Sequence, residues 1–510
     1  MNKNIVNNTV GIVGAGPVGL TVAARLANYG IRSIILEQSP HLIRKGSKAC
    51  LIQGDALEVL DKSGCADVIA EEGIHWRIAH TYVRGKELIS QEYPERVGYG
   101  EFVNISQYRI EQEVAGYIEK NPLTEIFWSY EVEAVSQDSQ TVTIIANTPE
   151  GKRELSFAYL VACDGVYSKI RDLTGVAWTG YTHQSRFLIT DIRANIPLKK
   201  ERHFHFDPEF NPGLQLVMHP QPDNIWRIDW QLAADADIEA ERENGELDRR
   251  IRRVIGDIPY NIEWLSTYKF NQRVVEKFRI NRIFFAGDSA HSLPPYGSRG
   301  MNSGIQDADN LAWKMAYVLK GWADDSLLDT YHDERYLAAK ENLRVTEATI
   351  KFMAPSSGLR HLIRNIILKL SSHFKSFRSL VDHGKMAQPF SYTTSEIIDS
   401  EPNEAYEFAR KADKSSLDIP LKVVLAFPKG VEHDSMPENA TNVYYDDIKF
   451  IRDFYHERAA WYVVRPDGHI AGRYQLCDVE AINHIIGRCI GSNSAEVEST
   501  TDLDCYDKAS

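Results

Sequence analysis

The first forty residues alternate between apolar stretches and a helical spacing of apolar positions. Residues 9–13 and 34–36 are short apolar stretches, which predict two buried strands. Between them, residues 18–29 carry apolar side chains at helical intervals, and the second strand ends at the acidic Glu37. The pattern predicts a strand, a helix and a second strand, which is the opening unit of an α/β fold.

Two later segments repeat the change from a buried strand to a loop and a helix. An apolar strand that begins at Leu160 runs into Asp164-Gly165, and the apolar residues 283–286 end at Gly287-Asp288. Residues 181–275 instead alternate apolar and polar positions, which predicts an antiparallel sheet. After the second segment an amphipathic helix is predicted, with an apolar face of Ile305, Ala308, Leu311, Ala312, Met315 and Leu319.

A glycine-rich loop joins the first predicted strand to the first helix. It consists of Gly14, Ala15, Gly16, Pro17, Val18 and Gly19. The first glycine permits a tight turn, the second lets the backbone approach a pyrophosphate, and the third lets the helix pack on the strand. Glu37 follows Gly19 by 18 positions and can accept both ribose hydroxyls of an adenosine. The arrangement predicts a dinucleotide site without distinguishing FAD from NAD.

The loop after residues 283–286 carries chemistry that favours a flavin. A carboxylate such as Asp288 can accept hydrogen bonds from ribityl hydroxyls, and Pro294-Pro295 keep the loop rigid because proline fixes φ. Residues 300–302 lie just before the predicted helix, so their N–H groups can point at the pyrimidine edge of the flavin, where reduced flavin is negative. We therefore expect FAD to contact Gly287, Asp288, Pro295, Gly300, Met301 and Asn302.

Together these blocks resemble the FAD-dependent aromatic hydroxylases, which are class A, single-component flavoprotein monooxygenases. Residues 46–49, 57–60, 203–208 and 221–229 add to the similarity, which is closest to 3-(3-hydroxyphenyl)propionate, chlorophenol and nitrocatechol hydroxylases. The resemblance covers nearly the whole chain and is weakest after residue 389. It implies further FAD contacts at Glu37, Gln38, Lys48, Gln107, Asp164 and Gly165, the last two also serving the nicotinamide donor.

Two of these positions depart from the family pattern. Gln38 and Lys48 stand where the family often has arginine. Lysine is a point charge and lacks the bidentate fork of a guanidinium. The departures therefore concern the pyrophosphate or NAD(P)H contacts and leave the FAD prediction unchanged.

The resemblance implies an α/β fold with a Rossmann-like FAD-binding domain of the p-hydroxybenzoate hydroxylase type. Residues 1–180 and 276–395 are expected to form this domain, with 81–110 joining a substrate-binding antiparallel sheet of residues 181–275. Residues 396–510 are expected to form a short thioredoxin-like domain. The chain has no CxxC motif, so we expect this domain to be redox-inactive.

Two segments late in the chain have distinct patterns. Residues 461–471 predict a hairpin with the turn Arg465-Pro466-Asp467-Gly468. Residues 357–379 predict a basic amphipathic helix, which can lie on a membrane surface. The alternative is a helix packed on the FAD domain with a solvated basic face, and it is favoured because most such helices bury their apolar stripe.

In the implied reaction, NAD(P)H reduces FAD, and O₂ then adds at the flavin C4a atom. The resulting hydroperoxide delivers oxygen to a phenolic or otherwise activated aromatic ring. The protein must exclude water and favour the phenolate through a base or a hydrogen-bond donor. Arg227 can bind a substrate carboxylate or form an internal ion pair with Asp229. The candidates for the catalytic role are His205, Arg227, Asp229 and Tyr296, each also compatible with a structural role.

Alternative functions are possible on the same scaffold, because function depends on the site rather than on the fold. One is a flavin-dependent epoxidase or Baeyer–Villiger-type tailoring enzyme. Another is a non-catalytic flavin-binding protein, against which the intact glycine and aspartate motifs argue. A tryptophan-type halogenase is disfavoured because the chain lacks the GWxWxIP stretch.

Composition narrows the class of protein further. The 510 residues carry a net charge of −13 without a dense basic block, which argues against a nucleic-acid partner. The six cysteines lack metal-ligand spacing, so we expect reduced thiols, a cytoplasmic location and no metal. Neither a signal peptide nor a membrane-spanning run is expected. The expected partners are an aromatic substrate and O₂, with a homodimer as a family-level expectation.

Overall fold

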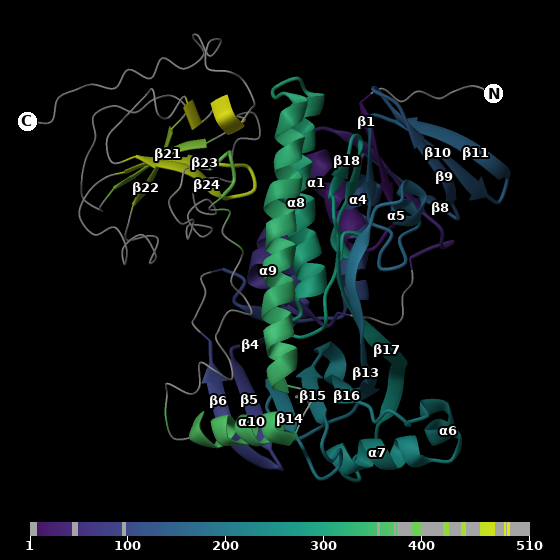
Figure 1. The fold of residues 1–510 in the computed structure, drawn as a ribbon, viewed down its shortest axis with the longest axis vertical. Helices are drawn as coiled ribbons and strands as arrows, with labels where there is room; N and C mark the ends of the chain where they lie inside the picture. The colour runs from purple at the N-terminus through teal and green to yellow at the C-terminus, as the bar shows by residue number, and fades with distance from the viewer. Residues whose placement is uncertain are drawn as a thin grey trace, which may run out of the picture.

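The chain forms an α/β region above a broad sheet, with a small C-terminal sheet beside the α/β region (Figure 1). The computed structural model describes residues 8–42, 49–93, 98–353 and 358–371, and shorter stretches between 374 and 489. The chain passes between the two larger regions several times, so each region contains segments that are distant in the sequence.

A parallel sheet forms the centre of the α/β region. Its strands are β1 (Thr9–Val13), β2 (Arg32–Glu37), β8 (Thr124–Trp128), β12 (Tyr159–Ala162), β18 (Arg279–Ile280) and β19 (Ile283–Phe285). They lie in the order β18-β19-β12-β1-β2-β8, and β18 alone among them pairs antiparallel with its neighbour. The central β1 is buried throughout, as expected of a parallel strand with both faces covered.

Helices and two small sheets surround this parallel sheet. α1 (Pro17–Asn28) packs on both α4 (Gln107–Lys120) and α8 (Arg299–Leu319). The shorter helices are α2 (Gly54–Asp61), α3 (Ala66–Glu72) and α5 (Lys169–Thr174). One small sheet contains β3 (Leu51–Gln53), β4 (Ile74–Trp76) and β7 (Phe102–Asn104), and the other β9 (Glu131–Gln137), β10 (Val142–Thr148) and β11 (Gly151–Phe157).

The broad lower sheet has eight strands in the order β20-β17-β13-β16-β15-β14-β5-β6. Most neighbours are antiparallel, and β14 and β5 are parallel. Residues 78–92 thus supply two strands, whereas β7 pairs with β3 and β4 instead. The bounds are Ile78–Val83 (β5), Lys86–Glu92 (β6), Trp178–Arg193 (β13), Arg202–Phe206 (β14), Gln215–Pro220 (β15), Ile225–Gln231 (β16), Asn261–Val275 (β17) and His291–Ser292 (β20).

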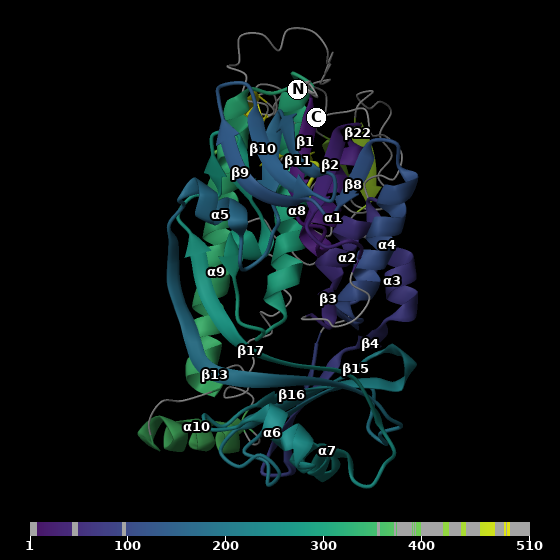
Figure 2. The ribbon, with the colours of Figure 1, turned by 90° about the vertical axis from the view of Figure 1, so that its right-hand side faces the viewer.

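Two helices that the sequence analysis does not predict cover the face of this sheet that points away from the α/β region (Figure 2). They are α6 (Ile238–Glu243) and α7 (Glu246–Ile255). Side chains alternate along a strand, so every second residue of β16 faces these two helices and the residues between them face the α/β region. The apolar cluster beneath the helices includes Leu188, Leu216, Met218, Trp226, Ile228, Trp230, Leu247, Ile251 and Ile255.

Helix α9 (Asp329–Met353) contacts α8 in the α/β region and β17 in the broad sheet. Helix α10 (Gly358–Ser371) follows it and contacts β6, while Leu368 packs with Phe204 and Phe206 of β14. The favoured prediction for this segment was wrong in two respects: α10 packs on the broad sheet, and its basic Arg364 is buried. Leu362, Ile363 and Ile366 are instead 57%, 49% and 49% exposed.

The C-terminal sheet has the strand order β22-β21-β23-β24. β21 (Lys422–Phe427) is parallel to β22 (Ala440–Tyr444) and antiparallel to β23 (Ala460–Val464). β23 and β24 (Ile470–Tyr474) form a hairpin around residues 465–469, in agreement with the sequence pattern. The thioredoxin-like assignment stays a prediction, because most of residues 399–459 lie outside the described part of the chain.

We expect Ile251→Ala to destabilise the broad sheet by about 3 kcal/mol, because the buried side chain would leave a cavity between α7 and the sheet. Urea unfolding followed by tryptophan fluorescence measures this, since Trp226 and Trp230 belong to the same cluster. The exposed Leu198→Ala is the matched control. Equal unfolding midpoints for the two variants would contradict the assignment of this cluster as a core.

Candidate functional site

Three glycines shape the turn between β1 and α1. Gly14 has a φ of +104°, and a Cβ there would lie 2.5 Å from the carbonyl oxygen of Cys163. A Cβ on Gly19 would lie 2.0 Å from the carbonyl oxygen of Gly14, so only glycine allows α1 this close to β1. Around Gly16, no described atom lies within 4 Å of the Cβ position. The N-terminus of α1 therefore faces open space, the geometry that a pyrophosphate requires.

Glu37 ends β2 beside this turn. Its Oε2 accepts a hydrogen bond from the N–H of Ala15, and its Oε1 accepts one from the N–H of Ser39, both at 2.8 Å. The two bonds fix the carboxylate at the edge of the glycine turn. The neighbouring Gln38 is exposed, and Lys48 lies outside the described residues.

Gln107 begins α4 and brings a second carboxylate near Glu37. Its Nε2 donates to Oε1 of Glu111 at 2.7 Å, and its N–H donates to the carbonyl of Ala49 at 3.2 Å. Burial raises the pKa of Glu111 to about 7, and the charge on Glu37 acts in the same direction. Sequence reasoning missed Glu111, although it lies one helical turn after Gln107 and therefore on the same face.

Asp164 follows β12 and is engaged through one oxygen. Its Oδ2 accepts a hydrogen bond from the N–H of Ile170 at 3.0 Å, while Ser168 caps α5 by accepting from the N–H of Arg171. Its Oδ1 is buried and has no hydrogen-bond partner among the described residues. Burial raises the pKa of this carboxyl. Buried acceptors are almost always hydrogen-bonded, so this oxygen is suited to accept from a hydroxyl or N–H group of a ligand.

Asp288 lies in a short 3₁₀ turn, Gly287–Ser289, that is fixed to α8 by a buried carboxylate. Asp307 of α8 accepts hydrogen bonds from the N–H of Gly287 at 2.9 Å and from Nε2 of His291 at 2.7 Å. Its other oxygen accepts from Arg335 at 2.6 Å. Although burial opposes it, His291 and Arg335 lower the pKa of Asp307 to about 2. His291 is thus a structural hydrogen-bond donor.

The N-terminus of α8 lies beside the Asp288 turn. The helix begins at Arg299, so residues 300–302 form its first turn rather than the loop before it. The preceding Ser298 has a φ of +53° and makes no capping hydrogen bond, and the first turn has no acidic residue. A Cβ on Gly300 would lie 3.8 Å from Oδ1 of Asp288. The N–H groups of this first turn have no acceptor one turn earlier in the helix, so they and the helix dipole favour an electronegative ligand edge.

Asn302 also ties this helix to β3. Its Oδ1 accepts a hydrogen bond from the N–H of Gln53 at 2.8 Å, and its Nδ2 donates to the carbonyl of Leu51 at 3.3 Å. The side chain of Asn302 thus holds the start of α8 against β3. The backbone N–H of Asn302 belongs to the first turn of the helix.

On the broad sheet, Arg227 pairs with a residue that the sequence analysis did not consider. Its Nε and Nη2 donate to the two carboxylate oxygens of Asp191, each at 2.8 Å. Asp191 and Arg227 lie directly opposite each other on β13 and β16. Of the two roles considered for Arg227, an internal ion pair is observed, but its partner is Asp191 rather than Asp229. Residues two apart on a strand lie farther apart than cross-strand partners.

Asp229 consequently keeps an oxygen without a partner. Its Oδ1 is buried and makes no hydrogen bond to any described residue. Burial raises the pKa of Asp229 to about 7, with Asp191 adding to the rise and Arg227 opposing it. Asp229 pairs with Ile189 of β13 and Tyr268 pairs with Phe187, two positions earlier, so both side chains lie on one face of the sheet. Burial raises the pKa of Tyr268, and the charge on Asp229 adds to the rise.

Aromatic side chains line the same face of the sheet. Phe187 lies opposite Tyr268 in the sheet, and its ring centroid is 4.5 Å from that of Phe270. Tyr296, from the loop between the Asp288 turn and α8, makes edge-to-face contacts with Phe187 at 6.3 Å and Phe270 at 5.8 Å. The structure therefore brings Asp229 and Tyr296 to one place, at the junction of the sheet and the loop before α8.

His205 lies on the other face of the sheet. It is paired with Leu216, which belongs to the cluster beneath α6 and α7, whereas Asp229 is paired with Val217. Its ring stacks on Tyr82 at 4.5 Å, and burial lowers its pKa to about 4. The structure does not bring this candidate to the site of Asp229 and Tyr296.

With this geometry in hand, comparison with known proteins identifies the family. Residues 7–346 match the FAD-binding domain family, and the chain belongs to it. The chain is 30% identical over 363 residues to the 3-(3-hydroxy-phenyl)propionate/3-hydroxycinnamic acid hydroxylase of Comamonas testosteroni. This match covers 70% of the chain and 60% of that hydroxylase, so the chain spans less than two thirds of the relative's length.

Solved structures show the same fold. A p-nitrophenol 4-monooxygenase from Pseudomonas putida DLL-E4 is 25% identical with a TM-score of 0.67, covering 75% of this chain and 98% of that one. An aklavinone-11 hydroxylase in complex with FAD and aklavinone is 20% identical with a TM-score of 0.72, covering 96% and 100%. The predicted Rossmann-like FAD-binding fold with an antiparallel sheet is confirmed.

FAD is the cofactor of this family, and the described residues fit it. The open space at Gly16 leaves room for a phosphate, the unpartnered Oδ1 of Asp164 can accept from a hydroxyl, and the uncapped start of α8 beside Asp288 suits an electronegative ring edge. A flavin dinucleotide carries all three groups. In the described part of the chain, no group of three or more His, Cys, Asp or Glu is placed to hold a metal ion. Among the same residues, every helix is too short or too polar to cross a membrane.

We expect Asp288→Ala to weaken FAD binding by about 10- to 100-fold, the loss associated with a hydrogen bond to a charged acceptor. Titration of the apo-protein with FAD, followed by flavin fluorescence, gives the dissociation constant. Asp324→Ala, at an exposed position before α9, is the control. An unchanged dissociation constant for Asp288→Ala would rule out a ribityl contact at this carboxylate.

Proposed function

We propose that this protein is an FAD-dependent monooxygenase that uses NAD(P)H and O₂ to hydroxylate a phenolic or otherwise activated aromatic ring. The observation that carries the proposal is the unpartnered carboxylate oxygen of Asp229 among aromatic side chains, on the sheet face that meets the Tyr296 loop. The printed names of two relatives, a hydroxyphenylpropionate hydroxylase and a p-nitrophenol monooxygenase, denote phenolic substrates.

In this proposal the substrate ring lies against Phe187, Tyr268, Phe270 and Tyr296. Aromatic walls favour a flat apolar ring through edge-to-face contacts and exclude water from its surroundings. Tyr296 belongs to the loop that leads into the first turn of α8. The same loop would therefore position both the substrate ring and the flavin edge.

Asp229 supplies the acid–base chemistry of the proposal. Its Oδ1 accepts a hydrogen bond from the substrate hydroxyl and takes up the proton as the ring becomes a phenolate, which is the more nucleophilic form. A pKa of about 7 suits this transfer, because it lies near the working pH. Arg227 stays bound to Asp191 and acts as a fixed positive charge beside Asp229.

When bound, reduced FAD would activate O₂ for transfer to the ring, and the residues of this chain would hold the FAD in place. A protein whose FAD is reduced by NAD(P)H would work in the cytoplasm, where this donor is found, so we propose a cytoplasmic location. The homodimer remains a prediction. The division into domains by residue number also remains a prediction. We propose that the residues in contact with FAD are Gly14, Ala15, Gly16, Pro17, Gly19, Glu37, Gln38, Lys48, Gln107, Asp164, Gly165, Gly287, Asp288, Pro295, Gly300, Met301 and Asn302.

The proposed function is tested by NAD(P)H consumption of the FAD-loaded protein in air. Hydroxyphenyl acids, nitrophenols, nitrocatechols and chlorophenols are added in turn, while peroxide and products are followed. We expect at least one phenol to accelerate oxidation and to emerge with one more oxygen on its ring. A product that is an epoxide or a lactone would point to a tailoring enzyme, and no response to any aromatic compound would refute ring hydroxylation.

We expect Asp229→Asn to lower kcat/KM about 100-fold with the phenol identified above, the usual loss on removing a general base. In the wild type the rate rises as the pH increases through about 7, because Asp229 must be deprotonated to accept the proton. The variant should lose this rise. Asp223→Asn, in the exposed turn before β16, should keep it. A pH profile unaltered by Asp229→Asn would exclude Asp229 as the base.

A further inference from the structure

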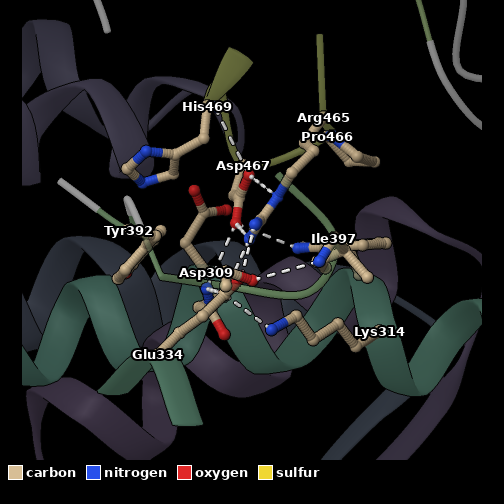
Figure 3. Close-up of polar contacts among 12 residues, drawn as sticks. Asp309, Lys314, Glu334, Tyr392, Ile397, Arg465, Pro466, Asp467 and His469 are labelled. Carbon is tan, nitrogen blue, oxygen red and sulfur yellow. Dashed lines mark hydrogen bonds and ion pairs between the residues drawn. The ribbon is translucent and has the colours of Figure 1, made fainter. Parts of the chain in front are cut away.

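The hairpin turn between β23 and β24 reaches α8 and α9 of the FAD-binding region (Figure 3). Arg465 forms a bidentate ion pair with Glu334 of α9, with nitrogen–oxygen distances of 2.5 and 2.9 Å. Asp467 accepts hydrogen bonds from Asn310 and Trp313 of α8 at 3.2 and 3.1 Å. All five side chains are buried. The hairpin is therefore attached to both helices through interior polar contacts.

The charges of this cluster balance one another. Arg465 also pairs with Asp467 at 2.5 Å, and Lys314 donates to Glu334 at 2.7 Å, so two cations meet two carboxylates. Burial alone would raise the pKa of Glu334, yet Arg465 and Lys314 hold it well below its usual range. Loss of Arg465 would leave excess negative charge in the interior, which the protein can relieve only by protonating a carboxylate, moving the helices apart or admitting water.

The same contacts continue to the Asp288 turn. Arg335 follows Glu334 on α9 and donates to Asp307 at 2.6 Å, and Asp307 accepts from the N–H of Gly287 at 2.9 Å. Most of these contacts come from one face of α8, because the four residues that make them recur at helical spacing. They are Ser303, which accepts from Arg335, followed by Asp307, Asn310 and Lys314.

Tyr392 provides a second connection between the hairpin and the contact between α8 and α9, which we call the α8–α9 seam. Its hydroxyl accepts a hydrogen bond from Nη1 of Arg335 at 2.7 Å. Its ring centroid lies 4.4 Å from that of His469, on the hairpin turn. Figure 3 shows Tyr392 and His469 on one side of the cluster and Lys314 on the other.

We propose that Arg465 is a positioning residue for FAD. By holding Glu334, Arg465 fixes α9 against α8. The α8–α9 seam in turn sets the position of the Asp288 turn and of the first turn of α8. The C-terminal hairpin thus takes part in flavin binding without contacting the flavin. The proposal concerns cofactor binding and does not depend on which substrate is hydroxylated.

The test compares FAD binding by the full-length wild type and Arg465→Leu. Each apo-protein is titrated with FAD, and the visible absorption spectrum of the bound flavin and the melting temperature are recorded. We expect the dissociation constant for FAD to rise about tenfold, within the usual range of coupling between distant sites, and the flavin absorption bands to shift. An unchanged constant together with an unchanged spectrum would overturn the proposal.

Arg250→Leu is the control, because Arg250 forms a bidentate pair with Glu241 between α6 and α7, away from the FAD-binding region, with 16% and 14% of the two side chains exposed. It should lower the melting temperature and leave the constant and spectrum for FAD unchanged. If it weakens FAD binding as much as Arg465→Leu does, general destabilisation explains both and the proposal fails. Should Arg465→Leu not fold, Asp467→Asn decides: a rise of the constant supports the proposal, and no change overturns it.

Discussion

One buried carboxylate determines how the flavin-facing segments are arranged. Asp307 accepts hydrogen bonds from the backbone of Gly287, from His291 and from Arg335, so it joins a strand end, a loop and two helices. Leaving any of these buried donors without an acceptor would lower the stability of the folded protein. Because α8 starts about two turns before Asp307, its N-terminus can occupy only one position relative to Asp288. The rest of the cofactor site is built around that fixed position.

The cofactor loops were the most predictable part of the structure. Gly14 and Gly19 are required by local geometry, a positive φ and a close backbone approach, and such constraints show in the sequence itself. The pairing of Arg227 with Asp191 could not be predicted in the same way, because it depends on the register between β13 and β16. Asp307 was missed because an aspartate within a helix gives no local sign of its partners.

Two errors concern amphipathic helices. The sequence of α7 has Leu247, Ile251 and Ile255 at helical spacing, so the signal for this helix was present amid its many charges. In α10 the pattern misled: Arg364 is buried with its guanidinium 5.4 Å from the centre of the Phe206 ring, while neighbouring apolar side chains are exposed. A flat guanidinium can pack on an aromatic ring, so charge alone does not identify the solvent-facing side of a helix.

The order of strands in the parallel sheet has a consequence for synthesis of the protein. The central β1 ends at Val13, yet its neighbour β12 ends at Ala162 and the next strand, β19, at Phe285. The chain from β1 as far as Phe285 must therefore leave the ribosome before β1, β12 and β19 can lie side by side in the cofactor-binding sheet. β1 exposes an apolar, unpaired edge until β12 has been made, and β12 then exposes such an edge until β19 has been made. Unpaired edges of this kind are surfaces that chaperones protect during the folding of large proteins.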